Sequence, residues 1–151
     1  MPRTPITIDD DREPRARQDI SQFAVSSEEI IEMLSMYDPY GIWKIDLESG
    51  NVFWSRDVYE IHGLEYHEGA VNLNEAIDAY HPDDAKIVAQ LIDETIENKS
   101  GYRFVLRLKQ RDGTFKMVKS VAKYRVNDEG REEICGLFSE FQLPIRNIAT
   151  H

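Results

Sequence analysis

Apolar and polar residues alternate along the second half of the chain, and this pattern predicts three consecutive β-strands. In residues 101–109 every second position is apolar, as expected for a strand with one buried face: Tyr102, Phe104, Leu106 and Leu108. Turn signals at Asp112-Gly113 and Asn127-Asp128-Glu129-Gly130 separate it from two further strands, over 115–126 and 134–141. A three-stranded antiparallel meander leaves one face exposed, so the earlier part of the chain is expected to cover it.

The first half of the chain carries a helical apolar period that is interrupted by one short hairpin. A helix is expected over residues 25–37, where Ser26 and Glu29 form a capping box. Its apolar stripe consists of Ile30, Ile31, Leu34 and Tyr37. Two short strands over 41–46 and 52–54 follow, and then three helices. One begins after Ser55, one after Asn72, and the longest at His81-Pro82-Asp83-Asp84.

These elements predict an α+β fold in which the hairpin and the meander share one five-stranded antiparallel sheet. The middle helices are expected to cover one face of this sheet. The helix over 25–37 is left to cover the other face, in the same chain or in a dimer mate. The expected organisation is a flexible N-terminal arm (1–23), a cap helix (24–40), a folded domain (41–142) and a C-terminal tail (143–151).

Composition and charge narrow the classes of function. The 151 residues carry a formal net charge of −10, which argues against a nucleic-acid-binding surface. Cys135 is the single cysteine, so no internal disulfide can form, and beside Gly136 it is expected to be a small buried residue. No apolar run approaches the ~20 residues needed to cross a bilayer. The polar, acidic N-terminus shows no signal peptide, so the cytoplasm is the expected location.

Residues with the chemistry for catalysis or metal binding are scattered. The histidines His62, His67 and His81, with Glu65 and Glu68 nearby, lack the spacing of a recognised metal site. No nucleophile elbow, P-loop or dinucleotide fingerprint is present. The sequence therefore predicts neither a metal site nor an enzymatic activity.

The two faces of the strand over 115–126 have different characters. One face is small near its middle, and small residues leave room for a ligand between sheet and helices. The candidate ligand pocket comprises Tyr59, Ile77, Leu91, Val118, Ser120, Ala122, Tyr124 and Phe138. The alternative is that large side chains fill this space as ordinary core. We favour this alternative slightly over a pocket that holds a cofactor. The opposite face needs a cover, and the predicted interface pairs Ile30, Ile31, Leu34 and Tyr37 with Phe115, Met117 and Val121.

A series of short motifs runs through residues 41–142: Gly41-Ile42-Trp43, Phe53-Trp54-Ser55, Ile61-His62-Gly63-Leu64, His81-Pro82-Asp83-Asp84, Leu106-Arg107 with Arg111-Asp112-Gly113, Asn127-Asp128-Glu129-Gly130, and Gly136. In this order and spacing the chain resembles the PAS domains, in particular the group with a PAC second half (PAS fold-3-like). The resemblance implies the mixed fold described above. It also implies a role in sensing small molecules, redox state or light, or in dimerisation and docking within signalling proteins.

Departures from the family pattern refine this expectation. Flavin-binding relatives use a cysteine in a helical Asn-Cys-Arg-Phe motif, and haem-binding relatives use a histidine of the long helix. Neither is present here, so the resemblance disfavours a flavin adduct and haem and leaves any cofactor unknown. Many relatives end in Asp-Ile-Thr and an output helix, whereas this chain has Glu140-Phe141-Gln142, and Pro144 is expected to interrupt such a helix.

The expectation is a stand-alone, non-enzymatic signalling protein that forms a homodimer, with an excerpt of a larger protein as the alternative interpretation of this chain. It would regulate a partner in trans, such as a sensor histidine kinase of bacterial two-component signalling. The alternatives are a small-molecule sensor with its ligand between sheet and helices and, more weakly, a small enzyme that uses the same cavity.

Overall fold

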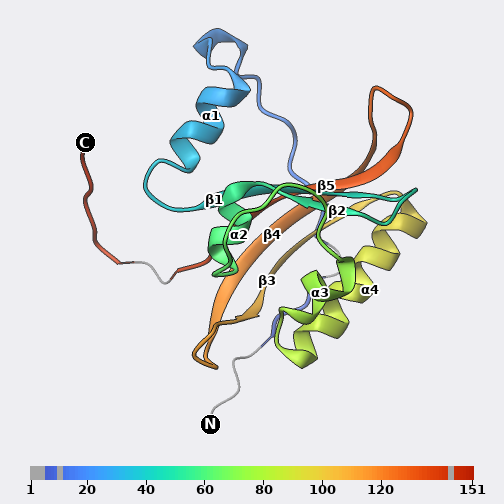
Figure 1. Ribbon diagram of the computed structural model, residues 1–151. Helices are drawn as coiled ribbons and strands as arrows, with labels where there is room; N and C mark the ends of the chain where they lie inside the picture. The colour runs from blue at the N-terminus through green and yellow to red at the C-terminus, as the bar shows by residue number, and fades with distance from the viewer. Residues whose placement is uncertain (1–5, 10–11, 143–144) are drawn as a thin grey trace.

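Five antiparallel strands form one sheet, as the sequence predicted, in the order β2-β1-β5-β4-β3. The computed structural model describes residues 6–9, 12–142 and 145–151 (Figure 1). The strands are β1 (Tyr40–Asp46), β2 (Val52–Trp54), β3 (Gly101–Lys109), β4 (Phe115–Val126) and β5 (Glu132–Glu140). The helices are α1 (Ser27–Leu34), α2 (Arg56–Ile61), α3 (Leu73–Asp78) and α4 (Pro82–Asn98), and a short 3-10 turn, η1, spans Ser21–Phe23. The α+β class is therefore confirmed.

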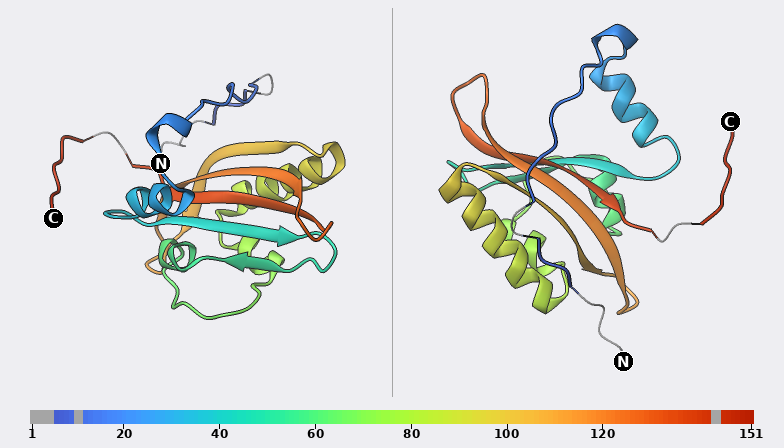
Figure 2. Two further views of the ribbon diagram at one scale, coloured as in Figure 1. Left: turned by 90° about the horizontal axis from the view of Figure 1, so that it is seen from above. Right: turned by 180° about the vertical axis from the view of Figure 1, so that it is seen from behind.

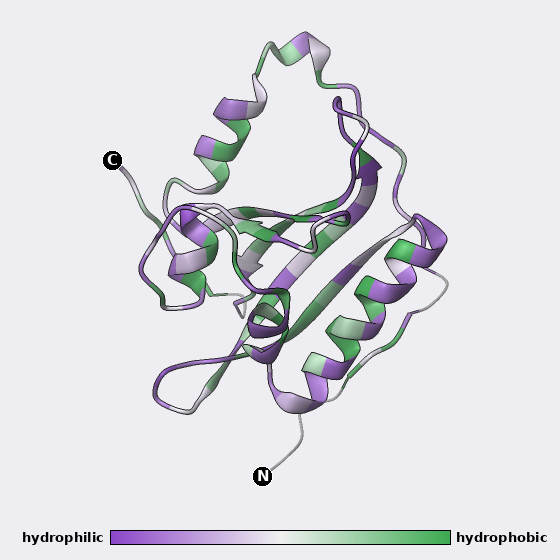
Figure 3. Ribbon diagram, turned by 45° about the vertical axis from the view of Figure 1, so that its right-hand side comes forward, coloured by the Kyte–Doolittle hydropathy of each residue, from purple (hydrophilic) through white to green (hydrophobic). Residues whose placement is uncertain are grey.

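The helices α2, α3 and α4 lie on one face of the sheet, here called the inner face (Figure 1). Along α4, hydrophobic and hydrophilic residues alternate with the helical period (Figure 3), and Val88 and Ile92 are buried. The period-two alternation of β3 and β4 places Phe104, Leu106 and Leu108 beside Val118, Ser120 and Ala122 on the inner face, and all six are buried.

Local sequence signals set most element ends. The capping box of Ser26 and Glu29 is present at the start of α1. Asn72 caps α3 by accepting hydrogen bonds from the backbone of Asn74 and Glu75, and the His81 Nδ1 atom accepts one from Asp83 at the start of α4. Gly113 and Gly130 occupy the two hairpin turns with φ of +85° and +78°, which glycine adopts without a steric penalty.

Two of these local predictions need correction. The helix α1 is shorter than the predicted 25–37, because the chain leaves helical geometry at Ser35, whose hydroxyl donates to the Ile31 carbonyl. Ser55 precedes α2 but does not cap it through its side chain. Its Oγ atom instead accepts a hydrogen bond from the Ile42 backbone at 2.9 Å, and so ties α2 to β1. The predicted interruption at Pro144 lies outside the described residues.

The outer face of the sheet is not covered by α1. This helix stands away from the sheet and contains no buried residue (Figure 1). The N-terminal arm, rather than α1, crosses the outer face of the sheet (Figure 2, right). That this arm is flexible stays a prediction. Cys135 also lies on this face, cross-strand from Lys44 and Lys123, and is half-buried rather than buried as expected.

Candidate functional site

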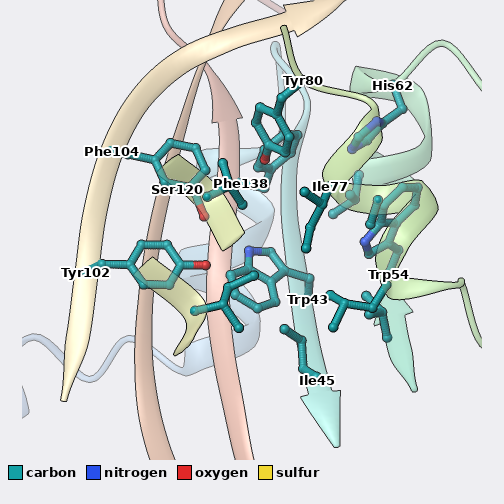
Figure 4. Close-up of a pocket in the computed structure, with 16 residues that line it drawn as sticks. Trp43, Ile45, Trp54, His62, Ile77, Tyr80, Tyr102, Phe104, Ser120 and Phe138 are labelled. Carbon is teal, nitrogen blue, oxygen red and sulfur yellow. The ribbon is translucent and has the colours of Figure 1, made fainter. Parts of the chain in front are cut away.

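A cavity of about 50 Å³ lies between the inner face of the sheet and the helices (Figure 4). Residues from β1, β2, β3, β4 and β5 meet residues from α2, α3 and α4 around it. Its walls are mainly aromatic and aliphatic, and the ten labelled residues are Trp43, Ile45, Trp54, His62, Ile77, Tyr80, Tyr102, Phe104, Ser120 and Phe138. Among the described residues that line it, none is Asp, Glu, Lys or Arg.

Two groups of stacked rings border the cavity. On the helical side, the His62 imidazole stacks on Trp54 with ring centroids 4.2 Å apart and on Phe138 with centroids 5.4 Å apart. On the sheet side, Tyr102 stacks on Phe104 with centroids 5.6 Å apart. Such contacts contribute about 0.5–1.5 kcal/mol each beyond the burial of apolar area, so the rings are held in defined positions.

Gly136 makes room for the Trp43 ring. It lies directly across from Trp43 in the pairing of β1 with β5. A Cβ atom at this position would lie 2.7 Å from two atoms of the Trp43 ring and 2.5 Å from the Val121 carbonyl oxygen. The absence of a side chain therefore lets the indole lie against the sheet and form part of the cavity wall.

Few polar groups face the cavity. In Figure 4 the hydroxyls of Tyr102 and Ser120 point toward its interior. Burial raises the pKa of the Tyr102 phenol, and burial followed by the nearby Tyr102 raises that of Tyr80, so both are neutral near pH 7. Burial, with a smaller effect of the Lys116 charge, lowers the pKa of His62 to about 4. The site is therefore uncharged at neutral pH.

The size of the cavity limits what it holds as it stands. Pockets for drug-sized ligands typically span about 300–1,000 Å³. A cavity of about 50 Å³ has room for water or a guest of a few atoms. Larger guests require rearrangement of the side chains that line it.

The structure brings together only part of the pocket that the sequence analysis described. Ile77, Ser120 and Phe138 line the cavity, whereas Tyr59, Leu91, Val118, Ala122 and Tyr124 do not. Tyr59 is buried with its ring packed edge-on against Trp54, Tyr66 and His67, and its hydroxyl has no hydrogen-bond partner among the described residues.

The other four predicted pocket residues lie outside the cavity because of the side chains around them. Val118 and Ala122 flank Ser120 on the inner face and are covered by packed neighbours, with 0% and 6% of their surface exposed. Leu91 is half-buried on α4 and packs against the core without reaching the cavity. Tyr124 lies near the end of β4, where its hydroxyl donates to Glu132.

Several cavity residues were not identified from the sequence. Trp43, Tyr102 and Phe104 occupy buried-face positions of β1 and β3, and the same period-two alternation that singled out β4 could have identified them. His62 was predicted as part of a family motif and tested as a metal ligand, but it was not predicted to line the cavity. It lies apart from His81, which is packed against Phe115 with ring centroids 4.8 Å apart. Within the described part of the chain, no group of three or more metal-ligating side chains is positioned to hold an ion.

The predicted interface residues lie on two separate surfaces. On α1, Ile30 and Ile31 are half-buried, and just beyond its end Tyr37 is exposed, as is Leu34 within it. On the outer face, Phe115 and Val121 are exposed, and Met117 is half-buried. No helix of the described residues has the length and apolar character needed to cross a membrane.

Comparison with solved structures finds the same fold in domains of other proteins. A sensory box histidine kinase/response regulator from Burkholderia thailandensis is 19% identical, with a TM-score of 0.58 over 76% of this chain and 84% of the other. The N-terminal domain of a diguanylate cyclase with PAS/PAC sensor from Marinobacter aquaeolei is 17% identical, with a TM-score of 0.58 over 67% and 94%. A domain of a light and redox sensing histidine kinase (described as putative) from Haloarcula marismortui is 13% identical, with a TM-score of 0.59 over 77% and 100%.

Comparison at the level of sequence identifies the family. No curated protein matches the chain. A family model described as "PAS fold" matches residues 51–136, which is more than half of the 151 residues. The matched segment runs from β2 through α2, α3, α4, β3 and β4 into β5, and so includes most of the cavity. The chain therefore belongs to the PAS family.

Proposed function

We propose that this PAS chain is a non-enzymatic cytoplasmic signalling module that forms a homodimer and regulates a signalling enzyme in trans. The observation that supports the proposal is that two apolar surfaces are exposed in the single chain. Leu34 and Tyr37 of the α1 region are 43% and 51% exposed, and Phe115 and Val121 of the outer face are 43% and 40% exposed. Exposed apolar surfaces of this kind are typical of protein interaction sites.

The charges around the two surfaces are complementary. The helix α1 carries Glu28, Glu29 and Glu32. The outer face carries Arg103, Lys119 and Lys123 on β3 and β4. Complementary charges favour one arrangement of the partners and speed their association, so α1 of one copy fits the outer face of another.

The class of the trans partner rests on two of the similar structures, one from a histidine kinase/response regulator and one from a diguanylate cyclase with a PAS/PAC sensor. We propose a sensor histidine kinase as the regulated enzyme. A partner that prefers one arrangement of helix on sheet would shift the population of that arrangement. The test is to add the purified chain to a candidate kinase and follow autophosphorylation. An unchanged rate with every kinase of the source organism would refute the trans role.

Size-exclusion chromatography with light scattering tests the dimer. Burying a Leu or Val side chain contributes roughly 1.5–3 kcal/mol, so Leu34→Asp is expected to weaken self-association at least about tenfold. Ile96→Asp is a matched control, because Ile96 is also exposed (41%) but lies on α4 at the other side of the sheet. A strictly monomeric wild-type protein at high concentration, or equal effects of the two variants, would refute the interface.

A second candidate function, small-molecule sensing, is supported by the aromatic cavity with its few inward-pointing hydroxyls. The uncharged walls favour a neutral guest. Native mass spectrometry of the purified protein separates the two proposals. A stoichiometric bound molecule would favour the sensor, and a protein mass without addition would favour the interaction module.

A further inference from the structure

The strand β3 forms one edge of the sheet, and among the described residues only its C-terminal half has backbone hydrogen-bond partners on the side away from β4. The Arg107 N–H donates to Asp84 Oδ2 at 2.8 Å, and the Arg107 carbonyl accepts from the His81 N–H at 2.9 Å. The Lys109 N–H donates to the Ala79 carbonyl at 2.9 Å. The segment that leads into α4 therefore covers this half of the edge.

The N-terminal half of the same edge presents free backbone groups. Backbone groups of alternate residues point to the same side of a strand, so those of Arg103 and Val105 point outward like those of Arg107 and Lys109. Among the described residues, no hydrogen bond reaches the N–H or C=O groups of Arg103 and Val105 on this side. A bare edge of this kind is a template for pairing with another strand.

The N-terminal arm already lies beside this edge. Ile6 and Thr7 line a groove of about 300 Å³ together with Arg103, Val105, Arg107 and Met117. In the right-hand view of Figure 2 the arm runs along the side of the sheet where α4 and β3 lie. The arm is thus held near the free groups, although its described residues form no strand pairing with them.

The sequence of the arm at this point suits a strand. Ile6-Thr7-Ile8 is a run of three β-branched residues, the type that is enriched in strands, whereas the rest of the arm is rich in proline and charge. The Ile6 and Ile8 side chains are 56% and 71% exposed. Asp9 follows directly, and its carboxylate complements the positive charge of Arg103 along the edge.

We propose that Ile6–Ile8 pairs with the Arg103–Val105 edge of β3 as a sixth strand, which covers a docking edge of the domain. The pairing is intramolecular, so it benefits from the high effective concentration of a tethered segment. An extended segment of another protein reaches the edge only by displacing the arm. This inference concerns the edge of the sheet and does not depend on the proposed dimer of α1 with the outer face.

Amide hydrogen exchange of the full-length chain, followed by NMR, tests the pairing. The amides of Arg103 and Val105 are expected to exchange at least about tenfold more slowly in the wild type than in a chain whose arm cannot pair. Thr7→Pro removes the N–H of the central arm residue, and the double variant I6P/I8P removes those on either side. One of the two variants must remove the inward-facing N–H groups, whichever register the arm adopts.

The control is Ala16→Pro, which introduces a proline farther along the exposed arm and is expected to leave the exchange rates at the wild-type level. Equal exchange at Arg103 and Val105 in the wild type and both arm variants would overturn the proposal. The proposal would also be overturned if these amides stayed protected in both variants and their protection rose with protein concentration. The strand paired with the edge would then belong to a second copy of the chain.

Discussion

The Asp84 carboxylate holds the start of α4 against β3, and replacing it with asparagine tests how much this contact stabilises the fold. Asp84 is only 4% exposed. Its Oδ1 atom accepts from Arg107 Nη2 at 2.7 Å, and its Oδ2 atom accepts from Arg107 Nε at 3.0 Å and from the Arg107 backbone N–H at 2.8 Å. Asp84→Asn removes the negative charge and one of the two acceptor oxygens, and so leaves the guanidinium without its charged partner.

The expected loss follows from the burial of the two side chains. Removing one partner of a buried ion pair typically costs about 3–5 kcal/mol. The Arg107 side chain is 27% exposed, so water can solvate part of the released charge and the lower end applies, about 3 kcal/mol. For a chain of this size, about 2–4 °C per kcal/mol corresponds to a melting temperature lower by roughly 6–12 °C.

Urea unfolding and thermal unfolding by circular dichroism measure this loss. Asp83→Asn is the matched control, since Asp83 lies in the same first turn of α4 but its side chain is 77% exposed. It should lose only the helix-dipole contribution of about 0.3–1 kcal/mol. Equal losses in the two variants would refute the assignment of the stabilisation to the Asp84–Arg107 pair.

The pH dependence of the same variant supplies a second check. Burial acts to raise the pKa of Asp84, but the hydrogen bonds and charge of Arg107 outweigh it and lower the pKa below the usual 3.8. A lowered carboxyl pKa stabilises the folded state above pH 3.8 and loses this effect as the pH falls through the folded value. The stability difference between wild type and Asp84→Asn should therefore persist down to about that pH and narrow below it.

Three further predictions concern the cavity and the dimer. Gly136→Ala should lower the free energy of unfolding in urea by about 1–3 kcal/mol, because the new methyl group overlaps the Trp43 ring; an unchanged value would show that the ring moves away freely. Wild-type stability should fall by up to about 3 kcal/mol as the pH drops from 6.5 toward about 4, because the unfolded chain takes up a proton that buried His62 resists. His62→Phe should abolish this fall, and an identical pH profile would contradict it. Light scattering should show weaker self-association as salt rises from about 0.01 M to about 1 M, which shortens the screening length from about 30 Å to about 3 Å; tighter association would exclude the acidic-on-basic arrangement of α1 and Lys123.

The sheet could be predicted from the sequence because its signals are local and repeated. Period-two alternation gave the buried face of β3, and glycine turns gave the ends of the meander strands. The starts of two helices could be predicted equally well at Ser26 and Asn72, where a side chain caps the first turn. The early end of α1 was harder to predict, since the apolar stripe continues to Tyr37 although the backbone leaves the helix at Ser35.

The cavity was predictable only in part. Its position between sheet and helices follows from the inner face of β4, and Ser120 lies where the alternation put it. Which inner-face residues border a void depends on the side chains packed opposite them, and the sequence does not reveal that pairing. Tyr59 illustrates the difficulty, since it is buried on α2 as expected but faces Tyr66 and His67. The path of the N-terminal arm had no periodic signal at all.

The composition of the cavity wall has a practical consequence. The chain has only 2 tryptophans, and both Trp43 and Trp54 line the same cavity, one from β1 and one from β2. The natural indole emission of the protein therefore originates entirely at this site. Any guest that enters, or any shift of α2 against the sheet, should change the colour or yield of that emission, so the unlabelled wild-type protein can be screened for ligands directly.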